Sequence, residues 1–189
     1  MMDEVQRLRK EVSELQTQLR KETMRCIDLE RRCALLEKLA ARDPLTGLNA
    51  ENYLHTRVRE EVERSTRYPA ATSLVTLCVP REHAHTMPRL GRQICAELRC
   101  TDQVFKLSDQ GVAILLIETP EEGAYNVLNR LREELEQFVK GYGYTVTSFP
   151  VHANLADEFF RLAMDRHREM SRKISPEGPD TVFHSAAVH

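Results

Sequence analysis

The sequence predicts an α/β domain with a central sheet flanked by helices, preceded by a long coiled-coil helix. Three observations support this fold class. Residues 5–40 follow a heptad repeat, helical and strand-like apolar periods alternate between residues 51 and 173, and a polar turn at residues 108–111 separates two short apolar runs. The expected order of α, β, α, β, β, α, β, α requires a sheet that contains both crossover and hairpin connections.

The amino-terminal segment, residues 1–42, is interpreted as a dimerisation helix. No Gly or Pro occurs between residues 3 and 41, and Val at the first seam register is followed three residues later by Leu at the second in the first two heptads. This pattern and the opposite charges beside the seam favour a parallel homodimer through residues 5–40, against the alternative of one amphipathic helix folded back on its own domain. The seam positions are Val5, Val12, Leu19, Cys26, Cys33 and Ala40 in one register and Leu8, Leu15, Glu22, Leu29 and Leu36 in the other.

Glu22, Cys26 and Cys33 interrupt the apolar seam. They are either tolerated imperfections or places where the coil shifts register or binds a partner helix. A disulfide between facing cysteines of a parallel dimer is geometrically conceivable, but free thiols are the expectation in a reducing compartment.

Composition excludes several function classes. The chain has 189 residues, with 27 basic and 29 acidic side chains and a formal charge of -2, so no net charge attracts nucleic acid or a membrane surface. Five cysteines without CxxC spacing and the lack of a signal-peptide pattern predict a cytoplasmic location. No segment approaches the length of a membrane span, so membrane insertion is not expected.

The remaining chain is expected to form one domain over residues 43–174 and a flexible, Pro- and Gly-containing tail over residues 175–189. Apolar spacing predicts helices over residues 51–67, 88–98, 120–139 and 156–173. Short apolar runs rich in β-branched residues predict strands over residues 73–79, 104–107, 112–118 and 144–149.

Two motifs in this domain resemble those of the GGDEF, or diguanylate cyclase, family. Asp43-Pro44-Leu45-Thr46-Gly47-Leu48-Asn49 is similar to the family's entry motif, and Arg99-Cys100-Thr101-Asp102 is similar to its RxxD motif. Together with the order of elements, the resemblance covers residues 43–173. It implies a GGDEF-like domain of the nucleotide-cyclase palm type.

The resemblance also implies that catalysis is lost. Family members carry metal-binding carboxylates at the end of the entry strand, where this chain has Leu77-Cys78-Val79-Pro80-Arg81. The signature turn is replaced by Ser108, Asp109, Gln110, Gly111 and Val112, and the connection that precedes Arg99 is shorter than in the family. Because a thiol and a proline cannot supply hard oxygen ligands for Mg²⁺, we expect no catalytic residue, no metal and no cofactor.

The RxxD motif implies a ligand. In the family, its Arg and Asp bind cyclic di-GMP together with an Arg on the helix after the hairpin, which corresponds here to Arg130 in Asn129-Arg130-Leu131-Arg132. A guanidinium can donate to guanine O6 and N7 or clasp a phosphate, and a carboxylate can accept from guanine N1 and N2. Arg99, Asp102 and Arg130 are therefore the candidate site, against the alternative of an exposed ion pair and a solvated helix arginine.

Other candidates carry less weight. His83 and His85 form half of a possible metal site in a predicted loop, without a carboxylate or cysteine at suitable spacing. Basic residues at positions 89, 92, 99 and 106 are interspersed with acidic ones, so nucleic-acid binding is not expected.

We therefore expect a catalytically inactive cyclic di-GMP receptor that signals, as a coiled-coil dimer, to an unidentified protein partner. One alternative is a ligand-independent dimeric adaptor that uses the domain as a protein-interaction surface. Another is a residual cyclase that depends on Asp109.

Overall fold

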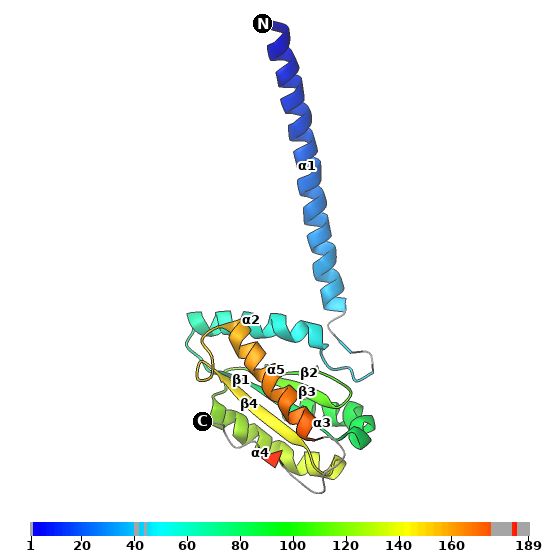
Figure 1. Ribbon diagram of the computed structural model, residues 1–189, viewed down its shortest axis with the longest axis vertical. Helices are drawn as coiled ribbons and strands as arrows, with labels where there is room; N and C mark the ends of the chain where they lie inside the picture. Colours follow the sequence, from blue (N-terminus) through cyan, green and yellow to red (C-terminus); the bar gives the residue numbers. More distant parts are fainter. Residues whose placement is uncertain (1, 40–41, 44, 175–182, 185–189) are drawn as a thin grey trace. The chain divides into compact units, whose positions relative to one another are not determined.

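A computed structural model describes residues 2–39, 42, 43, 45–174, 183 and 184. The chain divides into two compact units, Met1–Ala40 and Ala41–His189. The first unit is one helix, α1 (Met2–Leu39), and the second contains the sheet and the other helices (Figure 1). No helix in the described ranges has both the length and the apolar character that crossing a bilayer requires.

Helix α1 carries an apolar stripe exposed on the single chain. Val12, Leu15, Leu19 and Leu29 are all more than half exposed, with Leu19 at 68%. These are seam positions of the heptad, which a coiled coil would bury. The side chains of Val5, Leu8, Cys33 and Leu36, and all of Ala40, lie outside the described residues. Dimerisation through this stripe stays a prediction.

The sheet has the strand order β2-β3-β1-β4-β5. Its central strand β1 (Thr72–Cys78) is antiparallel to both β3 (Gly111–Leu116) and β4 (Gly143–Phe149). β2 (Gln103–Lys106) forms a hairpin with β3, as the polar turn predicts. The short strand β5 (Phe183–His184) pairs in parallel with β4.

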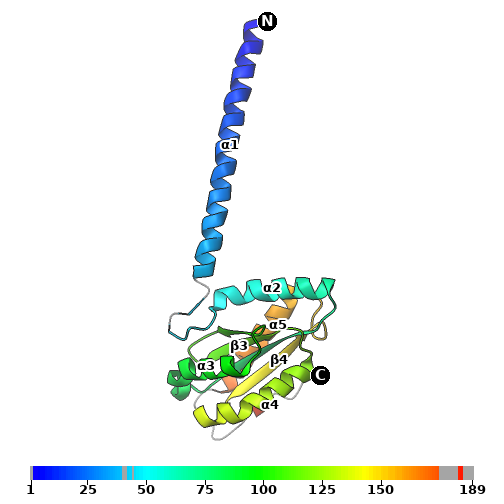
Figure 2. The same ribbon diagram turned by 180° about the vertical axis from the view of Figure 1, so that it is seen from behind.

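Helices cover both faces of this sheet. α2 (Glu51–Arg67) and α5 (Ala156–Lys173) contribute Leu54, Val58, Phe159 and Ala163 to the core on one face. α3 (Met87–Glu97) and α4 (Glu121–Phe138) bury Leu90, Ile94, Leu128 and Leu131 on the other face. α5 lies in front of the sheet in Figure 1, and α4 lies in front of it when the molecule is seen from behind in Figure 2.

All seven residues of β1 are buried, although three of them are hydroxyl residues. Their hydroxyls find partners within the sheet: Thr76 Oγ1 lies 2.8 Å from Thr145 Oγ1, and Ser73 Oγ donates to the Thr119 carbonyl at 2.8 Å. Because each buried hydroxyl is hydrogen-bonded, β1 avoids the desolvation cost of unpaired polar groups. Both faces of the strand can therefore be covered.

The outer edge of β2 is closed by the segment that leads into α2. The Asn49 amide donates to the Val104 carbonyl at 3.1 Å, and the Lys106 amide donates to the Asn49 carbonyl at 2.8 Å. This isolated parallel bridge covers an edge that would otherwise expose unpaired backbone groups. It also anchors the turn around Asp43 beside β2.

The elements between residues 51 and 173 confirm the predicted α/β order, with boundaries that differ by no more than two residues. One expectation was wrong: His83 and His85 lie in a 3₁₀ segment, Arg81–Thr86, and not in a loop, because hydrogen bonds such as His83 N–H to the Pro80 carbonyl close successive turns. Residues 183 and 184 form β5 within the segment expected to be a flexible tail, and the rest of that segment lies outside the described residues.

Helix α5 approaches the sheet closely where three small residues lie side by side. Cys78 is opposite Gly111 on one side and Gly143 on the other. A Cβ placed at residue 111 would lie 2.9 Å from Cε1 of His167, and one at residue 143 would lie 2.8 Å from Cγ of Met170. Both glycines are therefore needed for close helix packing and not for a special backbone angle.

We expect Gly111→Ala to lower the free energy of unfolding by about 1–3 kcal/mol, because the added methyl group overlaps the His167 ring. His167→Ala removes that ring, so the double variant is expected to be more stable than the sum of the two single effects implies. Urea denaturation of the four proteins measures this coupling. Additive losses would contradict the proposed contact.

Candidate functional site

A hydrogen-bonded turn precedes α2. The Thr46 amide and hydroxyl both donate to Asp43 Oδ1, at 2.8 and 2.6 Å, and Gly47, at φ +73°, donates its amide to the Asp43 carbonyl at 2.8 Å. The Thr46 hydroxyl is the main cause that lowers the pKa of Asp43, with Lys106 adding to the shift. Asp43 is therefore a structural carboxylate that organises this turn.

Lys106, at the end of β2, connects the Asp43 turn to the hairpin turn. Its Nζ lies 3.3 Å from Asp43 Oδ2 and 3.2 Å from Asp109 Oδ1. Partial burial lowers the pKa of Lys106, but the two carboxylates outweigh it and raise that pKa above its ordinary value. The Asp109 side chain is 85% exposed and is paired with the Lys106 ammonium group. Both residues line a surface pocket of about 420 Å³.

The hairpin turn is tied to the end of β1 through Gln110. The Val79 amide donates to the Gln110 carbonyl at 2.8 Å, and Gln110 Nε2 donates to the Val79 carbonyl at 3.3 Å. The Gln110 amide in turn donates to Ser108 Oγ at 3.2 Å. Backbone and side chain therefore both hold this turn against the strand end.

Cys78 occupies the last position of β1 as a packed thiol. Its Sγ lies 3.5 Å from Ser171 Oγ on α5, and burial raises the pKa of the thiol, so it stays protonated at neutral pH. The neighbouring His167 is only 9% exposed, and burial lowers the pKa of its imidazole, which keeps it neutral. Across the described residues, no three His, Cys, Asp or Glu side chains are grouped so that they could hold a metal ion.

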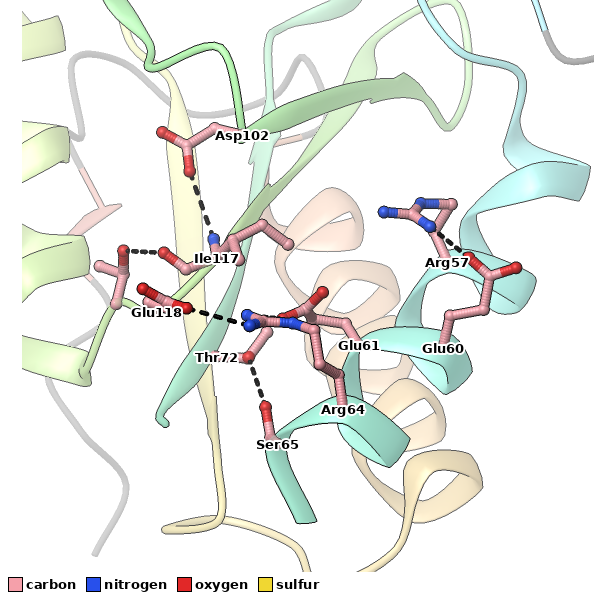
Figure 3. Close-up of polar contacts among 10 residues, drawn as sticks. Arg57, Glu60, Glu61, Arg64, Ser65, Thr72, Asp102, Ile117 and Glu118 are labelled. Carbon is pink, nitrogen blue, oxygen red and sulfur yellow. Dashed lines mark hydrogen bonds and ion pairs between the residues drawn. The ribbon is translucent and has the colours of Figure 1, made fainter. Parts of the chain in front are cut away.

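Asp102 holds the loop between α3 and β2. Its Oδ2 accepts from the Arg99 amide at 3.2 Å. Its Oδ1 accepts from the Ile117 amide, also at 3.2 Å, and Figure 3 shows this second contact. The loop that carries the RxxD motif is thereby fastened to the end of β3. Arg99 itself is exposed, and its guanidinium has no hydrogen bond or ion pair within the described part of the chain.

Arg99 and Asp102 line a surface pocket of about 560 Å³. The pocket lies among the Asp43 turn, α2 and the loop after α3. Its lining contains three arginines and one carboxylate, so the pocket favours an anionic ligand. Its lining residues include Arg42, Asn49, Tyr53, Arg57, Arg99 and Asp102.

The structure places the third predicted residue, Arg130, on α4 outside this pocket lining. Its Nη2 donates to the Glu97 carbonyl at 2.6 Å, and its Nε lies 4.0 Å from Glu97 Oε2. Glu97 is the last residue of α3, two residues before Arg99. Arg130 is therefore held beside the start of the RxxD loop, with 52% of its side chain exposed.

Sequence reasoning missed three pocket residues, Arg42, Tyr53 and Arg57. Tyr53 and Arg57 have the spacing of ordinary α2 positions, and Arg42 directly precedes the entry motif. The only signal was their nearness to that motif. The bridge between Asn49 and β2, which brings them to Arg99, depends on long-range pairing that local patterns do not predict.

Comparison with known proteins supports the fold assignment. No family model matches the chain. It is 25% identical over 114 residues to "Uncharacterized membrane protein YdaK" of Bacillus subtilis, which covers 54% of this chain and 40% of the relative. The chain therefore spans less than half the length of that curated protein.

Several solved structures share the fold. The diguanylate cyclase SiaD of Pseudomonas aeruginosa, solved with its activator SiaC, superposes with a TM-score of 0.58 at 22% identity over 92% of this chain and 72% of that one. The GGDEF domain of FimX from Pseudomonas aeruginosa gives 0.60 at 16% identity over 70% and 94%. A GGDEF domain described in a novel interaction mode with cyclic di-GMP gives 0.58 at 19% identity over 73% and 94%. The domain after α1 therefore has a GGDEF-like fold.

Proposed function

We propose that this protein is a catalytically inactive GGDEF-type receptor that binds cyclic di-GMP beside the RxxD loop and signals as a coiled-coil dimer to a protein partner. The observation that carries the proposal is the Arg99 guanidinium, which is exposed, unpaired among the described residues and located in a pocket with excess positive charge. An unpaired guanidinium can form bidentate hydrogen bonds with a guanine or a phosphate.

Arg130 and Asp102 contribute differently to this site. Arg130 donates to the carbonyl of Glu97, which is two residues before Arg99 in the chain. About half of the Arg130 side chain is exposed, so it retains donors for a ligand. Asp102 uses both carboxylate oxygens to hold the loop, and each oxygen retains a second lone pair that can accept from guanine. Asp102 therefore positions Arg99 and also offers a hydrogen-bond acceptor.

The arrangement at the hairpin turn favours a receptor over a cyclase. A cyclase would need carboxylates that bind divalent cations at the end of β1 and at the turn. Here the strand ends in a neutral thiol beneath α5, and the Asp109 carboxylate is paired with Lys106. The thiol offers no oxygen ligand, and the Asp109 carboxylate would have to give up its pairing with Lys106 to bind Mg²⁺.

We expect wild-type protein to bind cyclic di-GMP in isothermal titration and Arg99→Ala to bind at least about tenfold more weakly, because it loses charged hydrogen bonds. Arg161→Ala, an exposed arginine on α5, is the matched control and should bind as wild type does. Arg99 is preferable to Asp102 for this test, because Asp102→Ala would also release the loop. Wild-type protein that fails to bind the ligand would overturn the receptor assignment.

The same preparations separate the receptor from a residual enzyme. Incubation with GTP and Mg²⁺ should yield no cyclic di-GMP. Turnover that is lost in Asp109→Ala would instead assign catalysis to the turn. A protein partner whose capture is unaffected by cyclic di-GMP and by Arg99→Ala would favour the ligand-independent adaptor.

We expect Leu19→Asp to weaken dimerisation at least about tenfold, because a charge at a seam position must be desolvated in the coiled coil. Thr17→Asp introduces the same charge outside the predicted seam and serves as the control. Sedimentation equilibrium measures the association constants. A wild-type monomer at micromolar concentration, or equal effects of the two substitutions, would contradict the dimer.

A further inference from the structure

The pocket beside the RxxD loop contains two arginines that the proposed site does not use. We propose that Arg42 and Arg57 bind the phosphate groups of the nucleotide, with Tyr53 as a wall for its base. This inference rests on the proposed function and extends the same site toward the Asp43 turn and α2. It identifies the ligand class as a guanine nucleotide with more than one phosphate charge.

The charge of the pocket supports an anionic ligand. Arg42, Arg57 and Arg99 come from three separate segments of the domain, and all three line one pocket. The single carboxylate in the lining, Asp102, already accepts two backbone amides. Arg57 is already ion-paired with Glu60, whereas Arg42 and Arg99 have no ion pair among the described residues. An anion in the pocket is therefore attracted mainly by these two unneutralised charges.

Each arginine retains donors for such an anion. Arg57 donates from Nε to Gln103 Oε1 at 3.1 Å. It also pairs with Glu60 through Nη1, as Figure 3 shows. Arg42 donates from Nη1 to the Gly47 carbonyl at 3.1 Å. A guanidinium carries five N–H donors, so these contacts orient both groups and leave further donors for phosphate oxygens.

Tyr53 adds the second feature of a nucleotide site. Its ring lines the pocket and also lies 6.5 Å from the ring of Phe105, which is fully buried in the core. The aromatic wall is thus held by packing. A fixed aromatic face beside guanidinium groups suits a base that stacks and phosphates that accept hydrogen bonds. The pocket volume of about 560 Å³ is in the range of small-molecule sites.

Arg42 lies near the end of the amino-terminal helix in the sequence. It lies three residues after Leu39, the last residue of α1. A nucleotide that contacts Arg42 would therefore bind close in the sequence to the end of α1.

Isothermal titration of the full chain with cyclic di-GMP tests the inference. We expect Arg42→Ala and Arg57→Ala each to weaken binding at least about tenfold, as loss of a charged hydrogen bond requires. Arg67→Ala, an exposed arginine at the end of α2, should leave the affinity unchanged. Thermal unfolding without ligand reports whether each variant keeps the wild-type fold.

The outcomes separate this inference from the proposed function. If Arg99→Ala loses affinity but Arg42→Ala and Arg57→Ala do not, the inference is overturned and the receptor assignment stands. If wild-type protein binds no cyclic di-GMP, both are overturned. If Arg57→Ala lowers the melting temperature, Arg42→Ala decides, because the contact that Arg42 makes is with a backbone carbonyl on the surface.

Discussion

The antiparallel pairing of β1 with β3 on one side and β4 on the other is the interaction on which the rest of the domain depends. β1 is hydrogen-bonded along both edges and buried on both faces, so α2 and α5 must cover one face and α3 and α4 the other. The row of Gly111, Cys78 and Gly143 lets α5 approach the end of this strand. A charged, hydrated carboxylate at Cys78 would have to be buried under that helix at a large desolvation cost.

The same packing distinguishes the two ends of the β2–β3 hairpin. At the turn, Gln110 is hydrogen-bonded to Val79 at the end of β1, and Asp109 is paired with Lys106. At the other end, Asp102 fastens the RxxD loop to Ile117 while Arg99 stays unpaired among the described residues. An unpaired guanidinium is therefore found at the loop, whereas Lys106 and Asp109 at the turn are paired with each other. This arrangement is the one that the proposed receptor function requires.

Local patterns in the sequence predicted most of the fold. Apolar spacing located α2 through Leu54, Val58 and Val62, and the polar turn at residues 108–111 predicted the hairpin. The two-residue strand β5 and the bridge at Asn49 were not predicted, because neither has a period that local reading can detect. For the same reason, the sequence suggested Arg99 and Asp102 but not Arg42 or Arg57. Those residues join the pocket only through contacts between distant segments.

A crystal structure of the protein with cyclic di-GMP tests the central claim most directly. The account predicts a ligand in the pocket beside the RxxD loop, with a phosphate or guanine hydrogen-bonded to the Arg99 guanidinium and the turn at residues 108–112 unoccupied. A nucleotide bound at that turn, with Arg99 free, would contradict the account.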